Sequence, residues 1–240
     1  MNVLLDALAW LFSPERLTGT HALPARLGEH LGYTAIALLI SALIAIPLGY
    51  LIGHTGRGRG LAVLLSGAAR ALPSLGLLTI LALALGLAQA PLAATIVFVI
   101  LGVPSILAGA YSGLEAIDRS TIDAARAVGM TEWQILWRVE APLGLPLLVG
   151  GLRAAALQIV ATAVLAAYVN LGGLGIYIQR GIQLQRPDEL YGGAIAIVIL
   201  ALLVDGAFAL AQRATRPAGL SAGRTPKRLR APVAAAAPRT

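Results

Sequence analysis

The sequence predicts an all-α integral membrane protein with about five transmembrane helices. Apolar residues make up 58% of the 240 residues and charged residues 12%, whereas a soluble domain carries about 25% charged residues. The mean hydropathy of +0.82 agrees with this composition. Because a helix that crosses a bilayer needs about 20 predominantly apolar residues, the chain has room for one bundle of roughly five or six helices.

Each expected span is an apolar run of sufficient length. The run over residues 3–12 is too short to span and is interrupted by Asp6, so the sequence favours an interfacial helix there over a sixth, tilted span. We expect an extracytoplasmic segment over residues 1–30, a transmembrane domain over 31–212 and a basic, disordered tail over 213–240. The five runs that are long enough to cross are residues 31–53, 61–87, 93–111, 147–168 and 191–212.

The distribution of positive charge predicts the orientation in the membrane. Twelve of the Arg and Lys residues lie in one set of connecting segments and four in the opposite set. Because positive residues accumulate on the cytosolic side, we expect the N-terminus outside, and the C-terminus and the loop over residues 114–146 in the cytosol. The net charge of +7 lies largely beside the last span, which indicates attraction to anionic membrane lipid rather than to nucleic acid.

Several classes of function are disfavoured by what the chain lacks. It has no cysteine, and His21, His30 and His54 are scattered, so no catalytic or metal-binding residue is assigned. Asp205 is the one acidic residue in the predicted spans, which disfavours an ion-coupled secondary transporter, and no internal repeat supports one. The sequence has no Walker phosphate loop, so the energy for transport would come from another subunit.

The loop over residues 114–146 is expected to contain two short helices. Ser120 followed three residues later by Asp123 is a capping-box pattern, and Asp123 lies where the helix dipole favours negative charge. Gly129 stands where a left-handed residue would end this first helix. Taken singly, these residues are equally consistent with a cap and a stop that have no further function.

The second helix of the loop is predicted by another capping box. Thr131 and Gln134 have the spacing that this motif requires. We expect this helix to stop at Pro142 and Pro146, before the fourth span begins, because proline interrupts a helix interior.

The combination of these features indicates a docking element. The loop is longer than a mere connection between two spans needs to be. Ala124 and Ala125 are small enough to let a partner surface approach the backbone closely. Trp133 and Trp137 are typical of interfacial anchors, which is the simpler interpretation of those two residues.

The same loop resembles the coupling-loop signature of bacterial ABC importer permeases. The family pattern begins with Glu-Ala-Ala where this chain has Asp123 and two alanines, continues with a glycine six residues after the acid, and ends in Leu-Pro where this chain has Ala141 and Pro142. The resemblance implies that the loop inserts into a cleft of a separate ATPase and passes nucleotide-driven motion to the spans. The ATPase-coupling residues that it implies are Asp123, Ala124, Ala125, Gly129, Met130 and Pro142.

The resemblance also implies a fold and a set of partners. The fold is a core similar to that of the methionine importer permease, with a cytosolic coupling helix. The partners are two copies of an ATPase subunit, a second permease copy or a sister permease, and an extracytoplasmic substrate-binding protein, all at the bacterial inner membrane. ATP and Mg would be used by the ATPase, and this chain would bind no cofactor.

Further motifs are similar to those of the osmoprotectant branch, whose members carry glycine betaine, choline, carnitine and related quaternary ammonium compounds. Asn170 and Leu171 depart from the Gly-Ala step of that branch. A permease for methionine or another amino acid is the alternative. Since 5% of the chain is aromatic, we expect selectivity for such cations to lie mainly in the binding protein. The matching motifs are residues 70–75, 129–131, 142–146, 150–153 and 172–175.

The second span contains the candidate translocation path. Pro73 is expected to break this span, which is tolerated in a membrane where protein or a water-filled cavity covers the break. Arg70 lies one turn earlier, and a charge at that depth should face the bundle interior. Arg70, Pro73 and Ser74 are therefore predicted to line the path, although Arg70 would equally reach the cytosolic surface by snorkelling.

Two further features involve the fourth and fifth spans. Arg153 and Asp205 are expected to pair near the cytosolic face as a structural contact. Gly172, Gly173 and Gly175 follow the fourth span on the outer side, where a turn is the default interpretation. The family resemblance implies instead that these glycines form a flexible outer gate.

Overall fold

The computed structural model describes residues 3–215, and its regular elements are helices. The predicted tail over residues 213–240 lies almost entirely outside the described part of the chain. The elements are α1 (Val3–Leu11), η1 (Pro14–Leu17), α2 (Leu23–Thr55), α3 (Arg59–Ala71), α4 (Ser74–Leu85), η2 (Leu87–Gln89), α5 (Ala90–Glu115), α6 (Arg119–Ala127), α7 (Glu132–Ile135), a π-helical segment (Leu136–Glu140), α8 (Ala141–Ala163), η4 (Val164–Val169), α9 (Gly175–Gln183) and α10 (Pro187–Ala214).

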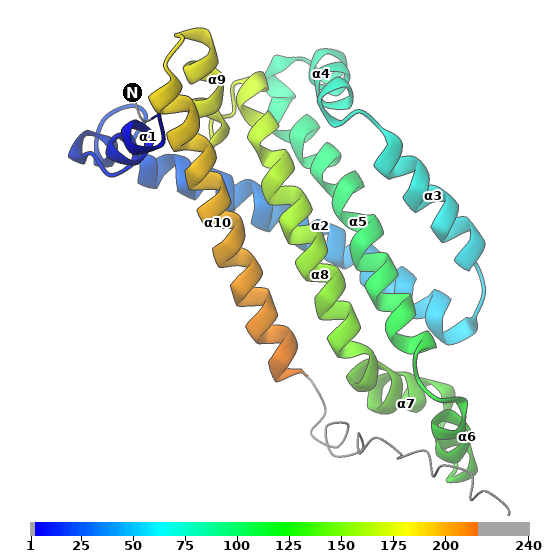
Figure 1. The fold of residues 1–240 in the computed structure, drawn as a ribbon. Helices are drawn as coiled ribbons and strands as arrows, with labels where there is room; N and C mark the ends of the chain where they lie inside the picture. The colour runs from blue at the N-terminus through cyan, green and yellow to red at the C-terminus, as the bar shows by residue number, and fades with distance from the viewer. Residues whose placement is uncertain (1–2, 216–240) are drawn as a thin grey trace, which may run out of the picture.

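The number of spans agrees with the predicted fold class. Four helical runs are long and apolar enough to cross a membrane, and the bent pair α3 and α4 raises the number to five if the pair counts as one broken span. The helix α1 has nine residues, which is too short to cross. It packs beside α10 at the end of the bundle that also holds α9 (Figure 1). We call this the α9 end, and the opposite end the α6 end.

The centre of the bundle is α5, which packs against α2 on one side and α8 on the other (Figure 1). Glycines allow α5 and α8 to approach closely. A Cβ atom on Gly113 would lie 2.6 Å from the carbonyl oxygen of Gly144, and one on Gly109 would lie 2.7 Å from that of Leu147. Gly109 and Gly113 form a Gly-xxx-Gly pattern, which lets membrane helices pack backbone to backbone.

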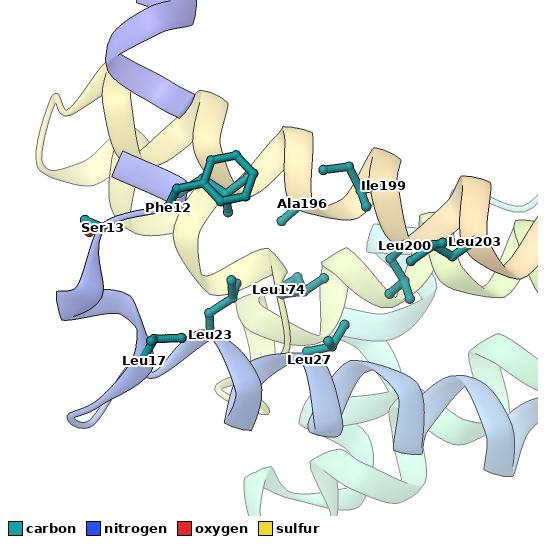
Figure 2. Close-up of a pocket in the computed structure, with 11 residues that line it drawn as sticks. Phe12, Ser13, Leu17, Leu23, Leu27, Leu174, Ala196, Ile199, Leu200 and Leu203 are labelled. Atoms are coloured by element: carbon teal, nitrogen blue, oxygen red, sulfur yellow. The ribbon is translucent and has the colours of Figure 1, made fainter. Parts of the chain in front are cut away.

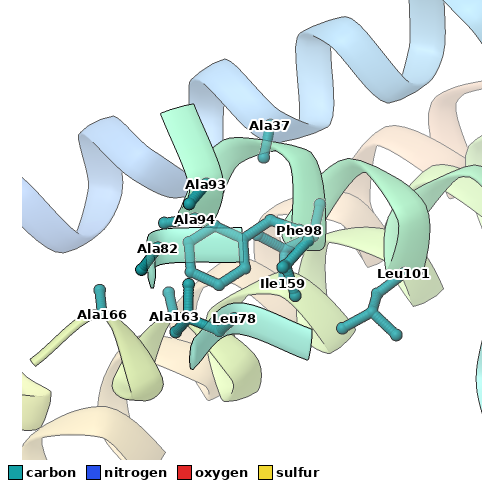
Figure 3. Packing of buried hydrophobic residues seen from close by; sticks show 11 residues of the cluster. Ala37, Leu78, Ala82, Ala93, Ala94, Phe98, Leu101, Ile159, Ala163 and Ala166 are labelled. Atoms are coloured by element: carbon teal, nitrogen blue, oxygen red, sulfur yellow. The ribbon is translucent and has the colours of Figure 1, made fainter. Parts of the chain in front are cut away.

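The apolar core near the α9 end is built around Phe98 of α5. Figure 3 shows its ring between small residues of several helices, among them Ala82 of α4 and Ala163 of α8. Leu78 and Ile159, both fully buried, complete the contact between the broken second span and the bundle. This cluster fixes α4 to the bundle, whereas in α3 only Ala62 is buried.

The predicted break of the second span at Pro73 is confirmed. The axes of α3 and α4 meet at 84°. Leu72 has the extended conformation that a following proline favours, with φ −68° and ψ 132°. Pro73 is the N-cap of α4. As a result, α3 runs along the bundle while α4 lies across its α9 end (Figure 1).

The predicted stop at Pro142 and Pro146 is wrong. Helix runs without an intervening loop from Glu132 to Val169, a length of 38 residues. Pro142 is tolerated because it lies in the first turn of α8, directly after the π-helical segment, where the N–H of Ala141 bonds to the carbonyl of Leu136 and the turn is wider. Pro146 lies inside α8, and the side-chain amide of Gln212 donates to its carbonyl at 2.9 Å.

Candidate coupling site and translocation path

The first loop helix, α6, begins earlier than the sequence predicts. Its N-cap is Asp118, whose Oδ1 accepts from the backbone N–H of Ser120 at 3.0 Å. This hydrogen bond holds the pKa of Asp118 below its ordinary value. The cap is therefore Asp118 and not the predicted Ser120, and its carboxylate also interacts favourably with the helix dipole. Asp123 is consequently not part of a capping box; it is exposed and pairs with Arg126 at 3.4 Å.

The end of α6 is the glycine stop that the sequence predicts. Gly129 has φ +84°, in the left-handed region. Its N–H donates to the carbonyl of Arg126 at 2.9 Å, and the N–H of Met130 donates to that of Ala125 at 3.2 Å. This pair of hydrogen bonds is the Schellman motif. A Cβ atom on Gly129 would have no neighbour within 4 Å, so the backbone conformation alone explains the glycine.

The second predicted capping box is confirmed at α7. The N–H of Thr131 donates to Oε1 of Gln134 at 3.0 Å, and the N–H of Gln134 donates to Oγ1 of Thr131 at 3.3 Å. The two loop helices are therefore fixed at their facing ends by local hydrogen bonds.

A small apolar cluster holds α6 against α7. It consists of Ile122, Ala125 and Ile135, with Met130 and Val139 packed against it. Ala125 is therefore internal to the loop rather than open to a partner.

The outer surface of the loop is more apolar than the sequence analysis anticipated. Ala124 is exposed on α6. Val128 is 78% exposed and Trp133 69% exposed, which adds two apolar side chains to the surface open to a partner. The sequence carried a signal for them: both are large apolar residues beside a predicted helix boundary.

An ionic network connects the loop to α2, and the sequence analysis missed it. Arg126 of α6 forms two hydrogen bonds with Glu132 of α7, at 2.8 and 3.1 Å. Nε2 of His54, at the end of α2, lies 3.5 Å from Glu132, and its Nδ1 lies 2.5 Å from Glu140. Glu140 is 6% exposed, and the contact with His54 gives its buried carboxyl group a hydrogen-bond partner. No local pattern announces this contact, because His54 and Glu140 are far apart in sequence.

The three predicted path residues lie together at the bend between α3 and α4. Arg70 and Pro73 are exposed on this chain, and Ser74 is half-buried. Nη2 of Arg70 lies 3.4 Å from Oγ of Ser105, in the middle of α5. Ser105 precedes the end of α5 at Glu115 by about 15 Å of helix. The guanidinium therefore lies at the middle of the bundle and not at the α6 end, where a snorkelling side chain would be.

The glycine turn between η4 and α9 is hydrogen-bonded to α2. Gly172 and Gly173 have φ values of +79° and +69°. The N–H of Gly173 donates to Oε2 of Glu29 at 2.8 Å, and the hydroxyl of Tyr33 donates to the carbonyl of Leu171 at 2.7 Å. These contacts identify a structured turn.

Steric and conformational constraints explain the composition of this turn. A Cβ atom on Gly175 would overlap the carbonyl of Val164. Asn170, where the chain departs from the family pattern, has φ +61°, a conformation that asparagine adopts more readily than most residues.

His30 is a buried residue that the sequence analysis left without a role. It is fully buried, and its Nδ1 accepts from the N–H of Leu174 at 3.3 Å. Nε2 therefore carries the proton and donates to the carbonyl of Val160 at 3.0 Å. The imidazole joins α2, α8 and the glycine turn.

The predicted pair of Arg153 and Asp205 is confirmed, but its depth differs. Two hydrogen bonds of 2.6 and 2.7 Å join the guanidinium to the carboxylate. Because α8 begins at Ala141 rather than near residue 147, Arg153 lies halfway along the helix. The pair thus links α8 and α10 inside the bundle rather than near its α6 end.

Together the bundle and its loop define a class: a polytopic membrane protein with two short, capped helices at one end. Residues 45–218 match the family described as binding-protein-dependent transport system inner membrane component, and the chain belongs to that family.

Named relatives narrow the class. A glycine betaine/carnitine/choline transport system permease protein of Bacillus subtilis is 32% identical, over 80% of this chain and 88% of its own. A choline transport system permease protein of the same organism is 31% identical, with the same two coverages. An osmoprotectant import permease protein of Salmonella typhimurium is 32% identical, over 80% of this chain and 91% of its own. The chain is therefore the permease component of an ABC importer.

Solved structures share the fold. Two inward-facing structures of the MetNI methionine ABC transporter match with TM-scores of 0.72 and 0.68. They are 23% and 24% identical and cover 85% and 81% of this chain and 100% and 96% of the matched chains. This likeness confirms the predicted core similar to that of the methionine importer permease.

Proposed function

We propose that this permease imports a small osmoprotectant, such as glycine betaine, choline, carnitine or a similar quaternary ammonium compound. The observation that supports this solute class is the similarity, over 80% of the chain, to permeases named for these compounds. The likeness to the methionine transporter concerns the fold and does not favour methionine as the solute. Import of methionine or another amino acid is therefore the competing assignment for the experiment to test.

In this proposal the α6 end lies in the cytosol and binds an ATPase subunit. The binding surface consists of the exposed residues Asp123, Ala124 and Val128, with Gly129 and Met130 setting the orientation of α6. Pro142 belongs to the same unit, because it begins the helix that carries the motion into the membrane. Two ATPase copies would use ATP and Mg, while the N-terminus lies outside and the C-terminus in the cytosol.

The position of Arg70 supports a path formed with a second permease, either another copy or a sister chain. An exposed guanidinium at the middle of the bundle cannot face hydrocarbon without a large penalty. The adjacent face of α3 is also uncovered, since Leu61, Leu64 and Leu65 are exposed. We assign this face to the partner permease, and Arg70, Pro73 and Ser74 to a water-filled path between the two chains.

The outer gate in this proposal is the glycine turn with Gly172, Gly173 and Gly175. Its hydrogen bonds to Glu29 and Tyr33 support movement of the turn together with α2, rather than flexing of the glycines alone. An extracytoplasmic binding protein would deliver the solute at this end.

The solute is tested by reconstituting the permease with its ATPase and binding protein in proteoliposomes. ATP-dependent uptake of labelled glycine betaine, choline or carnitine is the expected result. Uptake of methionine but none of these compounds would reject the solute assignment, and uptake without ATP would reject the importer mechanism.

Docking is tested by cross-linking, which is simple because the chain has no native cysteine. The variant Ala124→Cys should capture the ATPase, whereas Arg57→Cys, in the exposed loop between α2 and α3, is the matched control. Equal capture by both variants, or capture by neither, would reject α6 as the contact.

A further inference from the structure

An apolar cavity lies between α2 and α10, beside the N-terminal segment formed by residues 3–17. Its volume is about 450 Å³, within the range of small-molecule sites. Figure 2 shows Phe12 and Leu17 at one end, Leu23 and Leu27 on α2, and Ala196 to Leu203 along α10. Phe12 is 76% exposed and Leu203 67% exposed, so the cavity is open toward the surroundings of the bundle.

A second cavity, of about 580 Å³, lies on the other side of α1 and has a different character. Its lining includes Asp6, Glu15, Arg16, Arg186 and Asp188, so charges of both signs surround it. The guanidinium groups are already oriented: Arg16 lies 3.5 Å from Glu15, and Arg186 lies 3.1 Å from Asp188. Ser13 lines both cavities.

The N-terminal segment between the cavities is firmly attached. The ring of Trp10 packs edge-on against Tyr177 of α9, with 5.1 Å between the ring centroids. A Cβ atom on Gly192 of α10 would overlap the same indole, so α1 and α10 are in close contact. The guanidinium of Arg16 lies over the Trp10 ring, 4.8 Å from the ring centroid. Trp10 therefore holds α1 against α9 and α10.

We propose that the two cavities together bind one phospholipid with a zwitterionic headgroup. An acyl chain fills the apolar cavity beside α10, the glycerol backbone passes Ser13, and the headgroup occupies the charged cavity. There the phosphate contacts Arg16 and Arg186, while the ammonium contacts Asp6.

The arrangement of charge selects this occupant. An apolar groove next to purely basic residues would fit an anionic lipid, whereas this one adjoins both Arg and Asp or Glu side chains. The apolar lining on α10 lies in a run that crosses the membrane, and the charged lining lies at the start of that helix. The apolar lining thus lies deeper in the membrane than the charged lining, as the acyl chain of a phospholipid lies deeper than its phosphate and ammonium groups.

The acyl-chain half of the proposal is tested by native mass spectrometry of the full-length chain. The protein is purified with phosphatidylethanolamine, and retained lipid is measured for wild type, Ala196→Phe and Val198→Phe. Ala196 lines the cavity, whereas Val198 is an exposed residue of the same helix outside it. The new ring at position 196 occupies space assigned to the acyl chain, so Ala196→Phe should retain less lipid than wild type, and Val198→Phe should retain as much as wild type.

Phe12→Ala is a second test of the acyl-chain site. It removes part of the cavity wall at an exposed position, so it adds no bulk between the helices. It should also reduce retention. Equal retention by all three variants and wild type would overturn the proposal.

The headgroup half is tested by competition among phosphatidylethanolamine, phosphatidylcholine and phosphatidylglycerol. Wild type should retain the two zwitterionic lipids in preference to the anionic one. Arg186→Gln should reduce retention of the zwitterionic lipids, while Arg213→Gln, an exposed arginine at the other end of α10, should not. Equal retention of the zwitterionic lipids by wild type and Arg186→Gln would overturn the assignment of the charged cavity.

Discussion

Gly129 offers a sharp test of the coupling loop, because the structure separates conformation from packing at this residue. Its φ of +84° is left-handed, and a Cβ atom there would touch nothing within 4 Å. Within this chain, the effect of a substitution therefore comes from the backbone conformation. For an L-residue the left-handed conformation costs roughly 1–2 kcal/mol, with asparagine disfavoured less and β-branched residues more.

The consequences of losing this conformation extend to the docking surface. Without the Schellman hydrogen bonds, Met130 leaves the cluster of Ile122, Ala125 and Ile135, and α6 changes its angle to α7. A destabilisation of about 1–2 kcal/mol lowers the population of the docked geometry about 5- to 30-fold. We therefore predict that uptake decreases in the order glycine, asparagine, alanine, valine at position 129.

The assay is ATP-driven uptake in proteoliposomes, with the amount of inserted permease measured in the same samples. The substitution Gly129→Val should reduce uptake and substrate-stimulated ATP hydrolysis at normal insertion, and Gly129→Asn should retain most of both. If alanine, asparagine and valine variants all transported at the wild-type rate, or all failed equally, the conformational argument would be refuted.

Three other substitutions test the remaining contacts. Arg70→Ala should impair transport while leaving the ATPase bound, because it removes a charge proposed to line the path; uptake and co-purification report the two effects. His54→Ala leaves the buried carboxyl group of Glu140 without its hydrogen-bond partner, a loss of about 1–3 kcal/mol, and should reduce uptake per ATP hydrolysed, whereas adding Glu140→Gln should restore part of it. Gly113→Leu should unfold the bundle, since even a Cβ would lie 2.6 Å from a backbone oxygen; thermal unfolding in detergent measures this.

Each of these three predictions has a result that would contradict it. A fully active Arg70→Ala variant would favour a structural role for that side chain. No recovery in the double variant of His54 and Glu140 would show that His54 acts through other contacts. Gly67→Leu is the control for Gly113→Leu, because Gly67 on α3 has open space around its Cα, and equal losses of stability would contradict the packing argument.

Local patterns in the sequence predicted much of the fold correctly. Apolar runs identified the spans, because the length of a membrane helix is fixed by the bilayer. Thr131 with Gln134 and the glycine at 129 identified two helix boundaries, because these motifs satisfy backbone groups within a few residues. The break at Pro73 was also predictable, because a proline disrupts the helix through its own ring and missing N–H.

The errors and omissions have equally definite physical causes. Asp118 and Ser120 are both good caps, and the pattern does not decide which one the chain uses. The prolines after residue 140 normally end a helix, but a π-helical segment accommodates Pro142. The contact of His54 with Glu140 depends on how α2 packs beside the loop, which no short-range pattern encodes.

The absence of a loop between α7 and α8 has a mechanical consequence. The run Glu132–Val169 is a continuous helical element of 38 residues, about 57 Å long at 1.5 Å per residue. A tilt of about 10° around its midpoint displaces each tip by roughly 5 Å in opposite directions. In the proposed coupling, a displacement at Trp133 would therefore reach η4, on the far side of the bilayer, through a helical run with no loop in between.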